Sequence, residues 1–598
     1  MKLSDYIVDF FESQNVKDMF MVSGGGCMHL VDSFGNSKKI KYWCTHHEQA
    51  AAMAAEAYSK TNNDLGIVLT TSGPGATNTI TAVLDCWQDS TPVVFISGQA
   101  KSKQTVYSAG VTGLRQFGVQ EANIIPIVQS ITKYAVEVND PNEIRFHLEK
   151  AVYEAKHGRF GPVWLSIPLD IQSKNINPEN LKSFSPIQDE LYSPKNEDID
   201  YLISALKTAK RPVVIGGHGV RLSNAIDSFE RFISKFNLPV VTPIMGIDIL
   251  PDSHPSNIGR IGTKGTRAGN FAMQNADLII SMGSRLSVSV VGHEYNLFAR
   301  EAKVIVIDID KVEHEKNTIK IDKLINCDIL SFLEKINLDS FNCNADKSWL
   351  KKCQEWKEKY PVVLNEYNDD SNGINYYKFI DLLNNKSSSN MPFVSDAGSA
   401  FYVVAQAVKL KKGQRHITTG GTATMGFTLP AAIGVSRAMP KSCVLAVTGE
   451  GSLMQNLQEL EVLRLHNMNI KLFVMCNEGY FSIHQTQKKF FKGHFVGAGT
   501  ESGLSFPDFK KLAEAFELDY YKLDTINKAE SSLNDILANS KPALIEVTVD
   551  PNMEIIPTNA SLMRGDGSLV SKPLEDMYPF LPREEFKSEM FIEPVNED

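Results

Sequence analysis

The sequence has no segment typical of a membrane protein or of a secreted, disulfide-stabilised domain. No apolar run reaches the ~18 residues that a bilayer-spanning helix needs. The first residues, MKLSDYIVDFFESQ, have the pattern of an acidic amphipathic helix and not of a signal peptide. The eight cysteines are scattered and never form a C-x-x-C pair, so reduced, buried thiols are expected and a zinc site is not. We expect a cytoplasmic protein.

The chain also lacks long runs of positive charge. It has 61 Lys and Arg against 70 Asp and Glu, for a formal net charge of −9. Nucleic acids and anionic membranes both require concentrated positive charge, so neither is an expected partner. Small neutral or metal-compensated ligands fit this charge balance better.

Short repeats and low-complexity segments are absent as well, and 43% hydrophobic with 22% charged residues is typical of a folded globular protein. At roughly 150 residues per domain, the length of 598 residues predicts three or four domains. We expect three domains and a tail, at residues 1–175, 190–345, 365–550 and 551–598.

Each of the three regions alternates short β-branched runs, which end in glycine-rich turns, with amphipathic helices. In the first region, residues 66–87 predict a buried strand, a Gly-Pro-Gly turn and a helix. The polar, proline-bearing stretch 175–198 reads as a linker. The second region has further strands but no complete G-x-G-x-x-G motif. The expected fold class is α/β, with three doubly wound parallel-sheet domains and a proline-broken tail that packs over a neighbouring surface.

The strongest chemical signal lies in the third region. Glu450 follows one predicted strand, and Asn477 follows the next, 27 positions later (477 minus 450). A parallel strand–helix–strand unit brings both strand ends to one sheet edge, together with the carbonyl of Gly479. These three oxygen atoms are ligands of the kind that Mg²⁺ binds. The remaining coordination positions of the ion would hold diphosphate oxygens. The amides of Gly451 and Ser452, at a predicted helix N-terminus, would add donors for the same anion.

The segment TGEGSLMQNLQELEVLRLHNMNIKLFVMCNEGY resembles the G-D-G…N-N thiamine-diphosphate motif of acetohydroxyacid (acetolactate) synthases, and the similarity extends over nearly the whole chain. Glu450 stands in place of the family's Asp and Cys476 in place of its first Asn, while Asn477 keeps the metal-ligand position. Glu is longer by about 1.5 Å, so the loop or the ion must shift to keep a ligand distance of about 2.1 Å. The resemblance also assigns to the cofactor site Gly449, Tyr480 and Phe481.

The segment THHEQAAAMAAEAYSK resembles the family's H-E-Q-x-A helix. This resemblance places Glu48 at the glutamate that bonds the aminopyrimidine of thiamine diphosphate. A carboxyl group shielded from water has a raised pKa and can share its proton with the ring nitrogen, which lets the exocyclic amine deprotonate the thiazolium carbon. The alternative is an ordinary glutamate at a helix N-terminus beside His47. Glyoxylate carboligases, which carry valine at this place, fit less well.

The segment RHITTGGTATMGFTLPAAIG is similar to the family's G-x-M-G-x-x-L-P-A-A-I-G element. Met425 would be the wedge that bends the cofactor, and backbone groups of Ala423 and Met425 would bond the pyrimidine. Ala400 replaces a histidine of the family. The turn just before it matches the family's diphosphate contact, at Ala397, Gly398 and Ser399.

Resemblance assigns the substrate side to Gly25, a backbone donor, and to Gln120, with His47 and His484 as further polar candidates. Three positions that are bulky or charged in the family are small or apolar here, so we expect a wider pocket that accepts an acceptor larger than pyruvate. These three positions are Val119, Leu169 and Thr486.

The second region resembles the family's flavin-binding domain in the motifs GGHGV, GTKGT, GSRL and VIDID. Arg285 matches a flavin-contacting arginine, but Ser289 stands where a second arginine is expected. A Rossmann-like domain can also persist without its ligand. FAD therefore stays open as a cofactor, with a structural and not a redox role.

The resemblance implies a carboligase that decarboxylates a 2-keto acid, pyruvate in the first instance, and transfers the acyl carbanion to a carbonyl acceptor. A second pyruvate and a keto-sugar nucleotide are both open as acceptors. The alternatives are a simple 2-keto acid decarboxylase or oxidase, and a non-catalytic protein that keeps the fold. Because the family builds each active site from domains of two subunits, the resemblance implies a homodimer or homotetramer.

Overall fold

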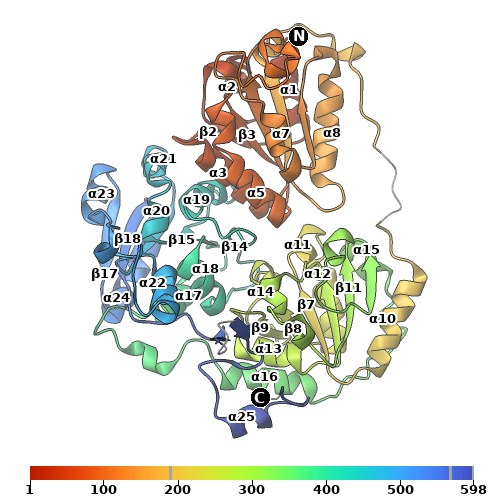
Figure 1. Cartoon of the computed structure of the whole chain (residues 1–598), viewed down its shortest axis with the longest axis vertical. Coiled ribbons are helices and arrows are strands. Elements are labelled where there is room, and N and C mark those ends of the chain that lie inside the picture. The colour runs from red at the N-terminus through yellow and green to blue at the C-terminus, as the bar shows by residue number, and fades with distance from the viewer. Residues whose placement is uncertain (187–191, 564–568, 596–598) are drawn as a thin grey trace.

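The computed structural model describes residues 1–186, 192–563 and 569–595 and has three sheets, each of six parallel strands (Figure 1). The predicted fold class, three doubly wound α/β domains with a C-terminal tail, is confirmed. Residues 187–191 of the predicted linker, and 564–568 and 596–598 of the predicted tail, lie outside the described residues.

The N-terminal sheet is covered by helices on both faces. Along β3, Ile67 and Val68 point to opposite sides and enter two different hydrophobic clusters, as expected for a strand buried on both faces. One face carries α3 (Glu48–Asn62) and α5 (Ile80–Asp89), and the other carries α1 (Leu3–Ser13) and α8 (Ile144–Lys156). The strands lie in the order β2 (Lys41–Cys44), β1 (Asp18–Met21), β3 (Gly66–Thr70), β4 (Val93–Gln99), β6 (Val163–Pro168) and β5 (Tyr134–Glu137).

The C-terminal sheet repeats this topology strand for strand. Its order is β14 (His416–Ile417), β13 (Phe393–Ser395), β15 (Val444–Gly449), β16 (Ile470–Cys476), β18 (Ala543–Thr548) and β17 (Asp519–Leu523). The helices that matter for the site are α18 (Gly398–Ala407), α19 (Thr428–Ala438), the single turn α20 (Glu450–Leu453) and α22 (Phe481–Phe490).

The N-terminal and C-terminal domains share one core, because α3 packs directly on α19 (Figure 1). Both helices present small side chains at the crossing. A side chain on Gly434 would place its Cβ 2.0 Å from the backbone oxygen of Ala54, so only glycine permits this approach. The alanine-rich sequence of α3 therefore serves domain pairing as well as helix formation.

The middle sheet has a different order, β12 (Lys323–Asn326), β11 (Lys303–Asp308), β10 (Leu278–Met282), β7 (Pro212–Gly216), β8 (Val240–Thr242) and β9 (Asn257–Arg260). Counted within the domain, this is the 3-2-1-4-5-6 arrangement of dinucleotide-binding folds. Its topological switch point lies between β7 and β10, which is where such folds hold a ligand.

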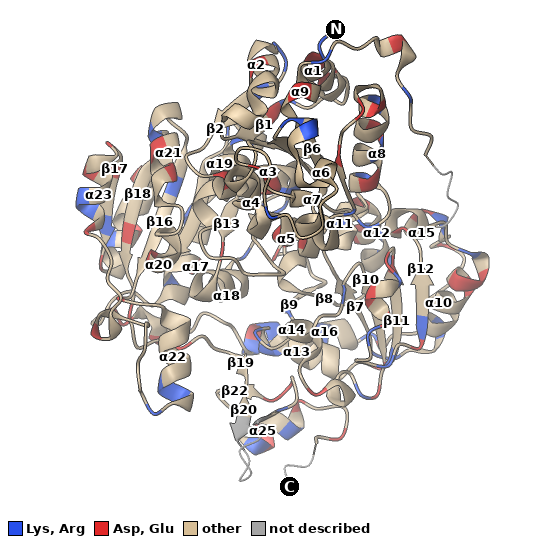
Figure 2. Ribbon diagram, turned by 45° about the horizontal axis from the view of Figure 1, so that its top comes forward, with Lys and Arg blue, Asp and Glu red and all other residues tan. Residues whose placement is uncertain are grey.

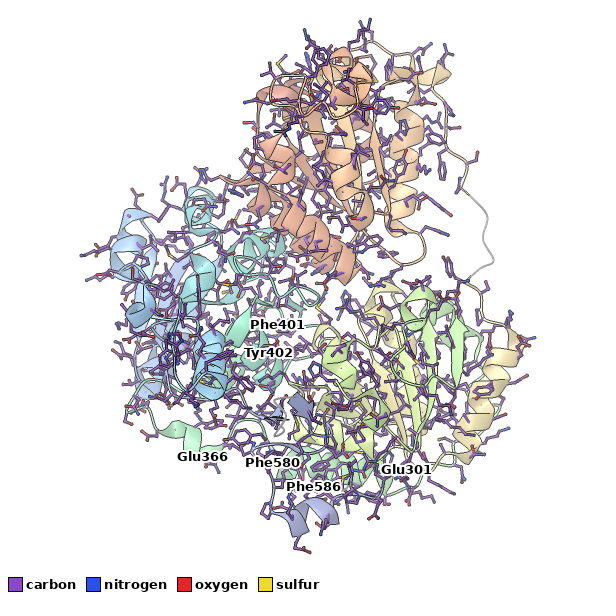
Figure 3. All side chains as sticks on the ribbon, viewed as in Figure 1. Glu301, Glu366, Phe401, Tyr402, Phe580 and Phe586 are labelled. Atoms are coloured by element: carbon purple, nitrogen blue, oxygen red, sulfur yellow. The ribbon has the colours of Figure 1, made fainter. Side chains whose placement is uncertain are left out.

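Within 176–186 the predicted linker contains one 3-10 turn, Pro178–Asn180, and no other helix or strand. Its last residues, 196–198, already belong to helix α10 (Asn196–Thr208), so the linker ends earlier than predicted. The tail crosses back to the middle domain, where Asn270 donates to the backbone oxygen of Leu574 (2.9 Å) and Phe586 joins the core of that domain (Figure 3). The expected packing of the tail is confirmed. Among the described residues, no helix combines the length and apolar character needed to cross a bilayer.

Candidate active site

A first group of predicted site residues surrounds the turn that follows β3. The backbone N–H of Gly26, beside Gly25, donates to Thr71 Oγ1 (3.0 Å). On the other side, a Cβ on Gly73 (φ 61°) would lie 2.4 Å from the backbone oxygen of Gln120. The carboxyl ends of parallel strands thus bring Gly25 and Gln120, which are 95 positions apart (120 minus 25), to one turn.

Glu48 lies at the same turn, as the first residue of α3. His47 is the N-cap, and its Nδ1 accepts from the backbone N–H of Gln49 (3.1 Å). The capping role therefore belongs to His47, and the half-buried Glu48 carboxylate is free to accept from Asn78 Nδ2 (2.9 Å). Its Oε1 lies close to Gly75. The structure accordingly gives the histidine a structural bond, whereas the catalytic role of Glu48 stays a prediction.

The loop that carries Gln120 is organised by its neighbour, Glu121. The buried Glu121 carboxylate accepts from the backbone N–H groups of Val106, Phe117 (2.8 Å) and Gly118 (2.9 Å). Gln120 itself has φ 54°, which a non-glycine residue adopts only when its surroundings impose it. The loop is therefore held in one shape while Gln120 stays exposed.

A second group of predicted residues gathers at the C-terminal sheet, around the buried carboxylate of Asp396. Asp396 accepts from the hydroxyls of Ser452 (2.5 Å) and Thr448 (3.0 Å) and from the backbone N–H of Ala397 (2.7 Å). Ser452 Oγ in turn accepts from the N–H of Gly426, next to Met425 (2.8 Å). One carboxylate thus links the strand ends of β13 and β15 to the loop of the predicted wedge.

The predicted metal ligands lie together at the ends of β15 and β16. Glu450 Oε1 accepts from the backbone N–H of Gly479 (2.7 Å) and of Asn477 (3.3 Å). Burial raises the pKa of Glu450 to about 7, against these hydrogen bonds, which lower it. A carboxylate, a carboxamide and a backbone carbonyl are oxygen donors of the kind that Mg²⁺ prefers, so the residues fit this ion. Their role in binding it stays a prediction.

Replacing Glu450 by Gln removes the only carboxylate among these three groups. We expect the Mg²⁺ concentration for half-maximal cofactor binding to rise at least about tenfold, because the charge that attracts the ion is lost. E450D keeps the charge and should bind Mg²⁺. Calorimetric titration with thiamine diphosphate at several Mg²⁺ concentrations measures the difference. An unchanged Mg²⁺ requirement in E450Q would remove Glu450 from the metal site.

The remaining cofactor candidates lie around this edge. Gly398 (φ 57°) begins α18 with Ala397 as its N-cap, and Ser399 and Ala400 are buried in the first turn. Tyr480 precedes α22, whose first residue is the buried Phe481. The ring of Tyr480 lies against Gly451. His484 stacks on Phe495 with ring centroids 4.0 Å apart, which gives that histidine a structural explanation.

The loop that carries Ala423 and Met425 is clamped by the N-terminal domain. Asp89 accepts from the N–H groups of Gly420 (2.8 Å) and Gly421 (2.7 Å). Asp85 accepts from the hydroxyls of Thr422 and of Thr424 (2.8 Å). Ala423, between the two threonines, has φ 50°. Two carboxylates of α5 therefore impose the shape of the predicted wedge loop.

Two of three neighbouring carboxylates pair with one lysine at this domain junction. Lys60 Nζ pairs with Glu56 (2.6 Å) and Asp89 (2.7 Å), and all of these groups are buried. Burial and neighbouring negative charge raise the pKa of Glu56, whereas the charge of Lys60 helps to keep the pKa of Asp89 low. Burial raises the pKa of Asp85 to about 6. Asp89 is the carboxylate that remains ionised beside Lys60.

Replacing Asp85 by Asn tests this charge arrangement. The folded-state pKa of about 6 lies above the usual range of an aspartate, so the protonated form that stabilises the fold is lost as pH rises through 6. Asp85 Oδ2 has no partner, so an amide there breaks no bond. Relative to the wild type, D85N should gain about 1 to 2 kcal/mol of unfolding free energy between pH 5 and pH 8. Urea unfolding at both pH values measures this gain, and a constant difference would refute the raised pKa.

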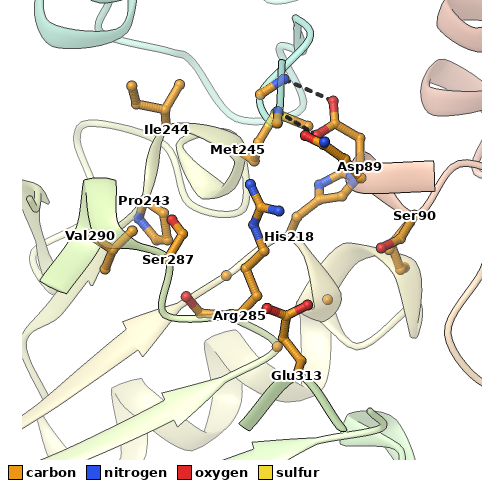
Figure 4. A pocket seen from close by; sticks show the side chains of 18 of the residues that line it. Asp89, Ser90, His218, Pro243, Ile244, Met245, Arg285, Ser287, Val290 and Glu313 are labelled. Carbon is orange, nitrogen blue, oxygen red and sulfur yellow. Dashed lines mark hydrogen bonds between the residues drawn. The ribbon is translucent and has the colours of Figure 1, made fainter. Parts of the chain in front are cut away.

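The middle domain borders a cavity of about 740 Å³ at its switch point (Figure 4). Arg285 reaches into it from the end of β10, and Ser289 also lines it. The opposite walls come from the C-terminal domain, at Phe401 and Tyr402, and from the N-terminal domain, at Asp89. A cavity of this size at this position can hold a dinucleotide.

Sequence reasoning did not find the residues that position these groups. Asn78 orients Glu48, Asp396 orients Ser452, and Glu459 accepts from the backbone N–H groups of His46 (3.1 Å) and His47 (3.0 Å) across the domain junction. Of these, Asp396 carried a signal, because it ends a predicted strand directly before the diphosphate turn. The partners of Asn78 and Glu459 lie 30 and 412 or more positions away, beyond any local pattern.

Three family profiles match the chain. They are the thiamine pyrophosphate enzyme N-terminal TPP binding domain over residues 1–121, the central domain over 199–336 and the C-terminal TPP binding domain over 396–547.

Relatives match over most of the length. The chain is 31% identical to the acetolactate synthase large subunit of Lactococcus lactis subsp. lactis (strain IL1403), over 93% of both chains. It is 30% identical to the acetolactate synthase large subunit of Cyanidium caldarium, over 91% of this chain and 92% of the relative. It is also 30% identical to the acetolactate synthase isozyme 1 large subunit of Escherichia coli (strain K12), over 93% and 95%.

Proposed function

The chain belongs to the acetolactate synthase large-subunit family of thiamine pyrophosphate enzymes, and on this basis we propose that its donor substrate is pyruvate. It is a thiamine-diphosphate-dependent carboligase that acts on small molecules. The observation that supports its chemistry best is the position of Glu48, held by Asn78 beside the turn after β3, against which the segments of Gly25 and Gln120 lie.

When bound, thiamine diphosphate would supply the carbon that attacks the keto acid and would accept the electron pair that stays behind when CO₂ leaves. Glu48 would exchange a proton with the pyrimidine ring of the cofactor through its carboxyl group, which Asn78 keeps oriented. Gly25 and Gln120 would hold the substrate. Met425, on a loop fixed by Asp85 and Asp89, would hold the two rings of the cofactor at the required angle.

The C-terminal group supplies the other half of the proposed site. Glu450, Asn477 and Gly479 would hold Mg²⁺, and the turns at the ends of β13 and β15 would hold the diphosphate. The contributing turn residues would be Ala397, Gly398, Ser399, Gly449, Gly451 and Ser452.

We propose a homo-oligomer in which each active site combines these two groups from different subunits. Exposed apolar side chains near the first group support a subunit contact, since Tyr107, Phe117 and Val119 are 76%, 54% and 86% exposed. A dimer is the smallest such assembly, and neither nucleic acid nor membrane is needed. The eight free cysteines support a cytoplasmic location.

We propose FAD as the occupant of the middle-domain cavity, in a structural role, with Arg285 as one contact. The 3-2-1-4-5-6 sheet and the cavity at its switch point support a dinucleotide. As domain limits we propose 1–175, 190–345, 365–550 and 551–598, supported by the extents of the three sheets.

Incubation with thiamine diphosphate, Mg²⁺ and ¹³C-labelled pyruvate, followed by NMR, tests the function. Labelled acetolactate would identify a second pyruvate as an acceptor. Release of CO₂ without a ligated product would identify pyruvate as donor and require another acceptor. No release of CO₂ would refute the proposed donor, and free aldehyde as the sole product would show a simple decarboxylase.

A further inference from the structure

Two segments of this acidic chain carry positive charge without any carboxylate. Residues 100–120 contain three cations and no Asp or Glu, and residues 481–498 again contain three cations and no Asp or Glu. The whole chain has a net charge of −9, so this distribution runs against its overall balance. The six cations are Lys101, Lys103, Arg115, Lys488, Lys489 and Lys492.

The first segment belongs to the N-terminal half of the proposed site. It begins directly after the carboxyl end of β4 and ends at Gln120. Lys101 and Lys103 flank Ser102, whose N–H and hydroxyl both donate to Asp170 (2.7 Å each). The far end of the segment folds back, since Gly118 lies against Ala100 and Gln104. Lys101 and Lys103 are therefore kept at the carboxyl edge of the sheet, in the same folded segment as Gln120.

The second segment belongs to the C-terminal half. Helix α22 starts next to Tyr480, at the proposed cofactor edge, and leads away from it to a lysine cluster (Figure 2). At 1.5 Å per residue, Lys488 lies about 12 Å from Tyr480 along the helix. A substrate as small as pyruvate, bound at the proposed cofactor edge, would not reach lysines that far along the helix.

All six side chains are exposed, and within the described ranges none of them pairs with a carboxylate. Other lysines of the chain do pair with carboxylates, as Lys352 and Lys359 do with Glu589 (2.6 Å each). The same two segments expose aromatic rings, with Tyr107 76% and Phe491 61% exposed. Unpaired cations beside exposed rings suit an anion that also carries a flat or apolar part.

We propose that the acceptor is a carbonyl compound bearing phosphate, whose phosphate groups lie about two helical turns from the carbonyl and are held by these two cationic segments, one from each of the two subunits that form the proposed active site. The proposal rests on the proposed function. Nucleotide-linked sugars and simple sugar phosphates share this chemistry. The reaction would form one carbon–carbon bond between the donor keto carbon and the acceptor carbonyl carbon. CO₂ leaves, the acceptor oxygen takes up one proton, and the phosphates are unchanged, so no oxidant is required.

Calorimetry on the holoenzyme, saturated with thiamine diphosphate and Mg²⁺, tests the site with UDP, CDP, GDP, ADP, dTDP and inorganic pyrophosphate as probes. We expect at least one nucleoside diphosphate to bind. The variants K488Q/K489Q/K492Q and K101Q/K103Q should each weaken that binding by about tenfold or more. The matched control K510Q/K511Q, which changes two exposed lysines on α23 (Phe509–Ala515), should bind as the wild type does.

The outcomes separate the possible sources of the phosphate. Tighter binding of one nucleoside diphosphate than of pyrophosphate would indicate a nucleotide-linked acceptor, and equal binding would indicate a simpler phosphate ester. Lack of binding by all probes, or equal affinity in every lysine variant, would overturn the proposal. The ¹³C-pyruvate assay tests the donor independently of the acceptor. CO₂ release from a protein that binds none of the phosphate probes would refute only the proposed acceptor. Binding of a phosphate probe by a protein that releases no CO₂ would refute only pyruvate as the donor.

Discussion

Replacing Glu48 by Gln is expected to lower CO₂ release from pyruvate by about 10²- to 10⁴-fold, the usual contribution of a positioned proton-transfer group. The amide has nearly the same shape and can still accept from Asn78, but it cannot exchange a proton with the cofactor. The loss should therefore appear in kcat, with thiamine diphosphate affinity much less affected. Single-turnover measurement of ¹⁴CO₂ from labelled pyruvate separates the chemical step from binding.

The matched control for E48Q is Glu179→Gln, which makes the same chemical change on an exposed side chain of the linker that follows this domain. That variant should keep wild-type turnover. If E48Q also keeps it, the carboxyl group is not the proton donor or acceptor, and Glu48 would be an ordinary residue at the start of α3. Loss of activity together with a lowered melting temperature would call for E48D as the second test.

Replacing Asp396 by Asn should weaken the binding of thiamine diphosphate by about 10- to 100-fold. Asp396 is fully buried and accepts on both oxygens, from hydroxyls on one side and from the N–H of Ala397 on the other. In D396N the amide NH₂ group replaces one accepting oxygen, so it faces a hydroxyl or an N–H group that also donates. One buried donor then stays unpaired, which costs about 1–3 kcal/mol. The cost falls on the turn that carries Ala397 and Ser452, so the diphosphate site should lose its shape.

Calorimetric titration of D396N with thiamine diphosphate at saturating Mg²⁺ measures this effect. Asp535→Asn, an exposed change on α24 (Ile526–Ala538), serves as control and should leave the affinity unchanged. Cofactor affinity equal to the wild type in D396N would show that the buried carboxylate supports the fold alone. Because Asp396 does not belong to the predicted metal ligands, the Mg²⁺ requirement of D396N should change less than that of E450Q.

The sequence alone predicted the α/β class and most of the central strands, because alternation of β-branched runs with amphipathic helices is a local pattern. It also placed Glu450 and Asn477 at one sheet edge, since two parallel strands joined by a helical crossover have their carboxyl ends on the same side. Glu48 and Met425 came from resemblance in short motifs. Their roles stay predictions, and the sequence alone did not predict which side chains contact them.

Tertiary structure decided what holds those residues in place. The bond between Asn78 and Glu48, the clamp of Asp85 and Asp89 on the wedge loop, and the close crossing of α3 over Gly434 all join positions that no local pattern connects. Such contacts depend on how separate elements pack, and a buried polar group takes whichever partner the packing supplies. The motifs of this chain therefore indicate which residue types are available for chemistry. The orientation of each proposed reactive group is determined only by the packing of the domains against one another.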